Sequence, residues 1–88
     1  MTNKVLIKLY IPEVEERFDL FIPVNEVVWK VTELISRSLS DITSFTLDNT
    51  KRNLLINRST SEIYDPNKII IDTDIRNATE LILLTIKK

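Results

Sequence analysis

The period of the hydrophobic pattern changes once along this chain, and that change restricts the folds open to it. Apolar residues alternate with their neighbours from Val5 to Ile11 and again from Phe18 to Ile22, which is typical of strands with one buried face. Pro12 ends the first segment, and the charged residues 13–16 suit a hairpin tip. The pattern therefore predicts two consecutive antiparallel strands.

Beyond these strands the apolar spacing becomes that of an amphipathic helix. Asn25 is a suitable N-cap, because its side-chain oxygen can accept a hydrogen bond from a backbone N–H of the first turn. We expect about four helical turns, with the end of the helix between Leu39 and Asp41. Its apolar face is predicted to contain Val24, Val27, Val28, Val31, Leu34, Ile35, Leu39 and Ile42.

The remaining sequence predicts shorter elements. Residues 43–53 have no steady periodicity, and we expect a connection there with a short strand at Phe45 to Leu47. Leu54 to Ile56 is predicted as a strand, and Glu62 to Tyr64 as its short return. One 3₁₀ turn is expected at Ile69 to Ile71, ahead of a last strand at residues 81–86.

The end of the chain carries a resemblance to a known class of domains. Asp72 and Ile75 have the spacing of an acidic residue and an isoleucine that close a loop under the sheet of ubiquitin-like domains, and the strand Leu81 to Ile86 follows. With the order of the other elements, the chain resembles a ubiquitin-like β-grasp protein over residues 5–86. The resemblance implies an α+β fold, in which residues 1–88 form a single domain. A mixed sheet of four to five strands would pack on one main helix, with the last strand parallel to the first.

Among ubiquitin-like proteins without a diglycine end, the chain looks most like the YukD/EsaB family, small bacterial proteins associated with type VII secretion systems. The likeness rests on the length, on the loop Asp72 to Ile75 and on the strand segment Glu80 to Leu84. The chain departs from the family pattern where Arg76 to Thr79 replace the glycine common before the final strand. The family implies a non-conjugated accessory subunit of a membrane secretion machine, and hence a cytoplasmic protein or one peripheral to a membrane protein complex.

A modifier or carrier used through its C-terminus is the main alternative function. A ubiquitin that is attached to targets needs a flexible diglycine end. This sequence contains no glycine and finishes with Lys87 and Lys88. We therefore expect a protein that is not conjugated.

Composition argues against several other functions. The chain has no cysteine and no histidine, which removes thiolate nucleophiles, the usual zinc ligands and the commonest general base. The acidic residues lack the spacing of a calcium loop, and Asp72 is expected to cap a turn, so we predict no metal, no cofactor and no enzyme. A net charge of −1 argues against nucleic-acid binding. No apolar run approaches the length needed for direct membrane insertion.

The outer face of the predicted sheet is the main candidate site. Side chains alternate along strands, so the apolar residues between the core positions must point outward. In a β-grasp sheet the first, second and last strands are neighbours, and these side chains would form one surface, with Leu55 as a candidate extension. Scattered surface hydrophobes are the alternative, but contiguous patches usually bind something. We predict a protein partner, either a membrane-embedded secretion component or a second copy of the chain, bound through Leu6, Tyr10, Phe21, Ile82, Leu84 and Ile86.

Trp29 is a second candidate for binding. It lies about 140° from the centre of the helix's apolar face and should point outward, where tryptophan is an effective interface anchor. With Asn25 as N-cap, however, Val24 and Trp29 occupy the two positions of a hydrophobic staple and would pack on each other. Both roles stay open, with the staple slightly favoured.

Overall fold

The computed structural model describes residues 3–40 and 51–87, and its elements follow the predicted order. The predicted strand at 45–47 and the apolar residue Ile42 lie outside the described residues. In chain order the elements are β1 (Lys4–Ile11), β2 (Glu16–Pro23), α1 (Val28–Ser40), β3 (Lys51–Asn57), the 3₁₀ helix η1 (Ile70–Asp72) and β4 (Thr79–Lys87).

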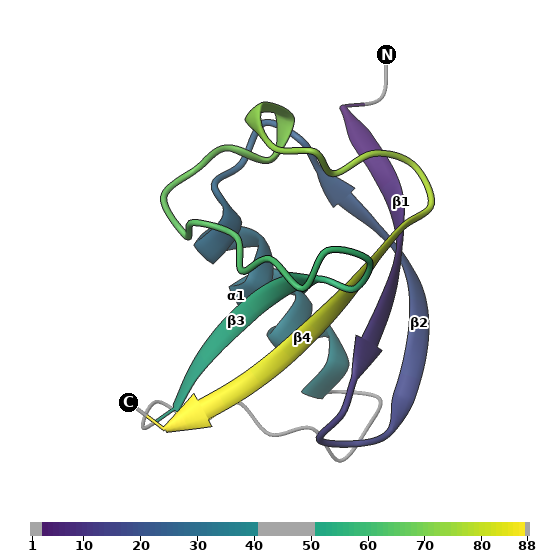
Figure 1. Cartoon of the computed structure of the whole chain (residues 1–88), viewed down its shortest axis with the longest axis vertical. Coiled ribbons are helices and arrows are strands. Elements are labelled where there is room, and N and C mark those ends of the chain that lie inside the picture. Colours follow the sequence, from purple (N-terminus) through teal and green to yellow (C-terminus); the bar gives the residue numbers. More distant parts are fainter. Residues whose placement is uncertain (1–2, 41–50, 88) are drawn as a thin grey trace.

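The strands form one mixed four-stranded sheet in the order β2-β1-β4-β3 (Figure 1). β1 pairs antiparallel with β2 and parallel with β4, as predicted for the first and last strands. β3 pairs antiparallel with β4 and forms one edge of the sheet. The predicted return at 62–64 contributes only an isolated bridge between Ile56 and Ile63. Pro66 follows two residues after Tyr64, and because proline has no backbone N–H, it cannot donate a further hydrogen bond to β3.

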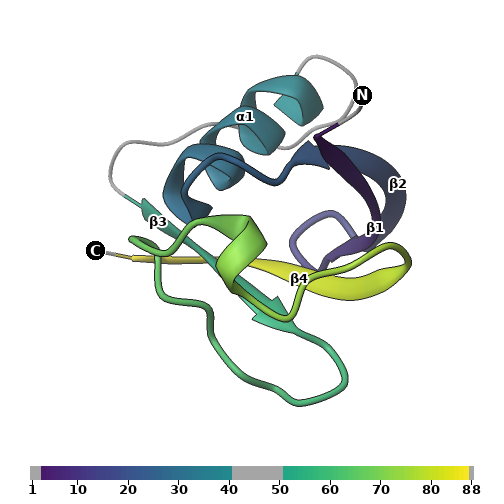
Figure 2. The same ribbon diagram turned by 90° about the horizontal axis from the view of Figure 1, so that it is seen from above.

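Helix α1 covers one face of the sheet, and the core lies between the two layers (Figures 1 and 2). The predicted helix face is confirmed at Val31, Ile35 and Leu39, whereas Leu34, at the margin of that face, remains 42% exposed. The buried apolar residues are Ile7, Leu9, Ile11, Ile22, Val28, Val31, Ile35, Leu39, Leu55, Tyr64, Ile70, Ile75, Leu81 and Leu83.

The start of α1 differs from the prediction. The helix begins at Val28, two residues later than an N-cap at Asn25 requires. The segment ahead of η1 supplies the cap instead: Val28 N–H donates to the Lys68 carbonyl at 2.8 Å, and Trp29 N–H donates to the Pro66 carbonyl at 3.0 Å. Because these distant carbonyls satisfy first-turn N–H groups, no side-chain N-cap is needed. The assignment of Asn25 as N-cap is wrong.

The loop between η1 and β4 closes as the Asp-x-x-Ile spacing predicts, but through a different side chain. Ile75 is 1% exposed and belongs to the core. The Thr73 hydroxyl donates to the Ile70 carbonyl at 2.6 Å and accepts from the Ile75 N–H at 3.2 Å. Asp72 is exposed. Thr73 therefore closes this turn, and the prediction that Asp72 caps it is wrong.

Within residues 3–40 and 51–87, left-handed backbone conformations occur at three positions of this glycine-free sequence. Glu15, Ser61 and Ala78 have φ values of 53°, 62° and 69°. A residue with a Cβ atom pays about 1–2 kcal/mol in this region, which glycine enters freely. Ala78 stands directly before β4. Glycine at this position would adopt the same conformation without strain from a Cβ atom.

Ala78→Gly is expected to raise the free energy of unfolding by about 1 kcal/mol, because relief of the Cβ strain exceeds the entropy that glycine adds to the unfolded chain. The melting temperature should rise by about 4–8 °C, measured by circular dichroism. Ser38→Gly, within α1 and exposed, should instead lower it. A lower melting temperature for Ala78→Gly would show that the left-handed conformation is not strained.

Candidate interaction surfaces

An apolar cluster lies around β4 on the outer face of the sheet. In the strand register Ile82 lies between Tyr10 of β1 and Ile56 of β3, and Leu84 lies opposite Leu54. These residues alternate with buried neighbours, so they point away from α1. All of them are half-buried. We define the apolar cluster as Tyr10, Leu54, Ile56, Ile82, Leu84 and Ile86.

A row of charged residues divides this cluster from the two remaining predicted site residues. Leu6 and Phe21 lie opposite each other on β1 and β2, and Phe21 is 68% exposed. The register then places the charged row between this pair and the cluster: Asp19, Lys8, Glu80 and Arg58. All six residues predicted for the sheet face are present at the surface, but the sheet brings only Tyr10, Ile82, Leu84 and Ile86 together. The prediction of one continuous surface is corrected to two patches.

The contribution of β3 to the outer face also differs from the prediction. Leu55 is 1% exposed and faces the core, so it does not extend the surface. Its neighbours Leu54 and Ile56 do so instead. Three consecutive apolar residues have no alternation, and their sequence alone does not show which of them faces inward. At the other side of the cluster the Arg17 guanidinium lies 5.5 Å from the centroid of the Tyr10 ring, within cation–π distance.

Trp29 points outward, as its position on the helix predicts. Its side chain is 48% exposed, and the Lys30 Nζ atom lies 5.9 Å from its ring centroid. The staple interpretation requires a helix that starts directly after Asn25, but α1 starts at Val28, so Val24 and Trp29 do not occupy the staple positions. The staple prediction is wrong, and a binding role for Trp29 stays a prediction.

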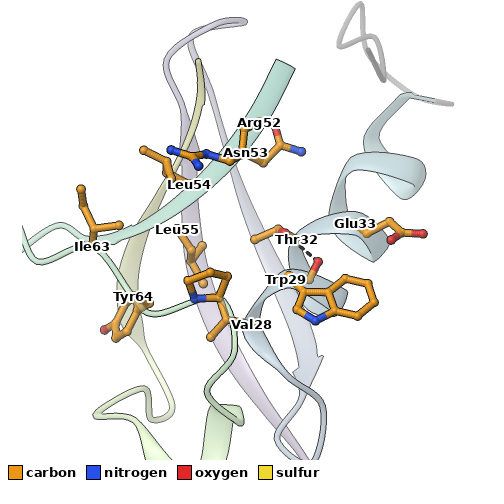
Figure 3. A pocket seen from close by; sticks show the side chains of 11 residues that line it. Val28, Trp29, Thr32, Glu33, Arg52, Asn53, Leu54, Leu55, Ile63 and Tyr64 are labelled. Atoms are coloured by element: carbon orange, nitrogen blue, oxygen red, sulfur yellow. Dashed lines mark hydrogen bonds between the residues drawn. The ribbon is translucent and has the colours of Figure 1, made fainter. Parts of the chain in front are cut away.

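A groove of about 600 Å³ lies between α1 and β3 (Figure 3). Trp29 and Thr32 line it on the helix side, and Leu54 lines it on β3. Ile63 and Tyr64 line it from the segment that bridges to the edge of β3. Sequence reasoning missed this groove. The predicted return strand at 62–64 indicated that Ile63 and Tyr64 lie beside β3. The distance between α1 and the edge of β3, which opens the groove, depends on tertiary packing and has no local sequence signal.

A polar network fixes the end of the groove that contains Tyr64. The Asn57 Nδ2 atom donates to the Tyr64 hydroxyl at 2.9 Å, and that hydroxyl donates to Asp74 Oδ1 at 2.5 Å. Tyr64 is 8% exposed and Asn57 is 7% exposed. Burial, with the hydrogen bond to Asp74, raises the pKa of Tyr64 to about 12. The phenol is protonated at neutral pH, and its hydrogen bonds to Asn57 and Asp74 connect β3 to the loop before β4.

Carboxylates do not gather into a metal site in the part of the chain that the structure describes. Over residues 3–40 and 51–87, no group of three His, Cys, Asp or Glu residues could hold a metal ion. Asp74 accepts the hydrogen bond from Tyr64, and the nearby Asp65 carboxylate accepts one from the Asn67 N–H at 2.9 Å. Across the same residues, no helix is long and apolar enough to cross a membrane.

Comparison with solved structures decides the class of the fold. The ubiquitin-like domain of EccD5 from Mycobacterium xenopi aligns with a TM-score of 0.70 at 8% identity, and the alignment covers 97% of each chain. This chain has a ubiquitin-like β-grasp fold. A chain of the MycP5-free ESX-5 inner membrane complex aligns with a TM-score of 0.71 at 11% identity. That alignment covers 98% of this chain and 22% of the other.

The same fold also occurs in a different setting. A chain of the toluene 4-monooxygenase HD complex with 4-bromobenzoate aligns with a TM-score of 0.76 at 6% identity, over 92% of this chain and 96% of the other. No family model matches the sequence, and no curated protein matches it. At these identities the structural likeness shows the fold alone, and function must be argued from the surface.

Proposed function

We propose that this ubiquitin-like domain is a non-catalytic, non-conjugated interaction module that docks on a protein component of a bacterial type VII secretion system. In this proposal the domain is cytoplasmic and lies at the periphery of the membrane complex. The apolar cluster on the outer sheet face is the observation that carries the proposal.

The apolar cluster has the composition of an interface core. One aromatic and five aliphatic side chains from three adjacent strands lie on one rigid sheet face. Charged residues surround them: Arg17 contacts Tyr10, Arg52 lies opposite Ile86, and Arg58 pairs with Glu80 at 3.7 Å. An apolar centre with a polar rim is the usual anatomy of a protein interface. The cluster therefore suits a protein partner with an apolar centre of its own.

Two observations support a secretion partner over other protein partners. The sequence resembles the YukD/EsaB family at the Asp72 to Ile75 loop and in the final strand. Solved structures with the same fold include the EccD5 ubiquitin-like domain and a chain of the ESX-5 inner membrane complex. A ubiquitin-like domain is thus a known building block of one such machine, and we extend that role to this chain.

The test is capture of the partner from native membranes solubilised in mild detergent, followed by affinity measurements with the purified partner. Ile82→Ser combined with Leu84→Ser should weaken binding by more than about 2 kcal/mol, the scale of an interface hot spot. The matched control is Leu6→Ser combined with Phe21→Ser, which removes two apolar side chains on the other side of the charged row. This control should bind nearly as the wild type does.

Three results would overturn the proposal. Equal loss of affinity in both double variants, with unchanged melting temperatures, would mean that the apolar cluster has no special role. A ladder of heavier covalent species on denaturing gels of native cells would favour the modifier function. Loss of binding in Trp29→Ala alone would place the docking surface on the helix.

A further inference from the structure

The outer edge of β3 offers backbone hydrogen-bonding groups beside the groove. The Leu55 carbonyl accepts from Tyr64 N–H, and Asn57 N–H donates to the Glu62 carbonyl, both at 2.9 Å. These groups point away from β4. Strand geometry directs the Asn53 N–H and C=O and the Leu55 N–H to the same side. Within residues 3–40 and 51–87 no backbone group binds them there.

The chain itself shows that this edge accepts a strand. The bridge between Ile56 and Ile63 is antiparallel and uses the end of β3 nearest Asn57. The other end of the edge, at Asn53, is adjacent to the groove. An extended segment bound at Asn53 would direct alternate side chains toward α1, where Trp29 lines the groove, and the others toward the outer face, where Ile63 bridges to Ile56. Trp29 and Ile63 are 48% and 55% exposed, so both have apolar surface left to bury.

The charges at this site favour an acidic ligand. Glu33 lines the groove, but its carboxylate pairs with the Arg37 guanidinium at 2.9 Å. Arg52 also lines the groove and is exposed. It forms no ion pair with another residue of the ranges 3–40 and 51–87. Among the described residues that line the groove, Arg52 therefore offers a positive charge to a ligand.

We propose that the edge of β3 and the adjoining groove bind an extended peptide segment of a partner protein. The segment adds a strand to β3 at Asn53 and Leu55, places an apolar side chain against Trp29, and pairs an acidic residue with Arg52. Recognition by strand addition obtains affinity from backbone bonds and specificity from side-chain pockets. A second copy of this chain fits less well, because its β3 edge, Lys51–Asn57, contains no acidic residue that could pair with Arg52.

The experiment is selection from a phage-displayed library of random linear peptides about ten residues long, the length of a strand. Enriched peptides are expected to combine alternating apolar residues with an acidic residue. Trp29 is the chain's only tryptophan, so its fluorescence should change on titration with each synthetic peptide. Hydrogen exchange should show new protection at the Asn53 and Leu55 amides.

Matched variants separate this site from the rest of the surface. Trp29→Ala and Arg52→Glu, measured by calorimetry, should each weaken peptide binding by about tenfold or more. Phe21→Ala also removes an exposed aromatic side chain, but on β2, and should leave the affinity unchanged. The Ile82→Ser, Leu84→Ser double variant should bind the peptide normally, which distinguishes this site from the apolar cluster.

Several outcomes would overturn the inference. One is a selection that yields no peptide above background, and another is a peptide whose protected amides lie on β2. A third is self-association that protects the Asn53 and Leu55 amides without any peptide, which would assign the edge to a second copy. Full binding by both Trp29→Ala and Arg52→Glu would likewise exclude the groove.

Discussion

Val31→Asp is expected to prevent folding. Val31 is 1% exposed and lies on the side of α1 that packs against the sheet. Among the residues that the structure describes, no basic side chain is buried in the core. Burial of an unpaired charge costs several kcal/mol even when the group is protonated instead. The whole free energy of unfolding of a domain is about 5–15 kcal/mol. Circular dichroism should show no cooperative thermal transition for this variant.

The neighbouring substitution Lys30→Asp provides the matched control. Lys30 is exposed on the same helical turn, and its Nζ atom lies within cation–π distance of the Trp29 ring. Loss of that contact costs about 0.5–1 kcal/mol at an exposed site, while an acidic residue in the first turn is favourable to the helix dipole. Similar melting temperatures for the two variants would mean that the buried face of α1 is assigned wrongly.

Periodicity predicted the layers of this fold because each layer has one buried face. The alternation in β1 and β2 and the 3.6-residue spacing in α1 identified most of the core, including Ile7, Val31 and Ile35. The start of the helix was not predictable in this way. Carbonyls of Pro66 and Lys68, far along the chain, bind the first helical N–H groups, and only the tertiary fold brings them there.

The candidate surface was predictable in orientation but not in extent. Alternation places Leu6, Tyr10 and Phe21 on the outer face. Whether they meet the side chains of β4 depends on the parallel register, which sets Lys8 opposite Glu80 and so divides the face. The groove at the edge of β3 depends on the distance between helix and strand, for which the sequence has no local signal.

The stability of the domain is expected to fall between pH 10 and pH 12 because of Tyr64. The pKa of this phenol is raised to about 12 in the folded protein, against 10 for an ordinary tyrosine. In that range the unfolded chain binds fewer protons than the folded one, so the free energy of unfolding decreases as pH rises. The contribution is complete below pH 10 and is lost at about pH 12. Its size is about 2–3 kcal/mol.

Tyr64→Phe isolates this contribution from the other groups that titrate at high pH. At neutral pH the variant should be about 3 kcal/mol less stable in urea unfolding, because the buried Asn57 amide loses its acceptor and Asp74 loses its donor. Its stability should then decline less steeply than that of the wild type between pH 10 and pH 12. Because the two proteins differ at this position alone, the difference in slope belongs to Tyr64. Parallel pH profiles would mean that Tyr64 ionises in the folded domain as it does in the unfolded chain, and that the bond to Asp74 does not hold its proton.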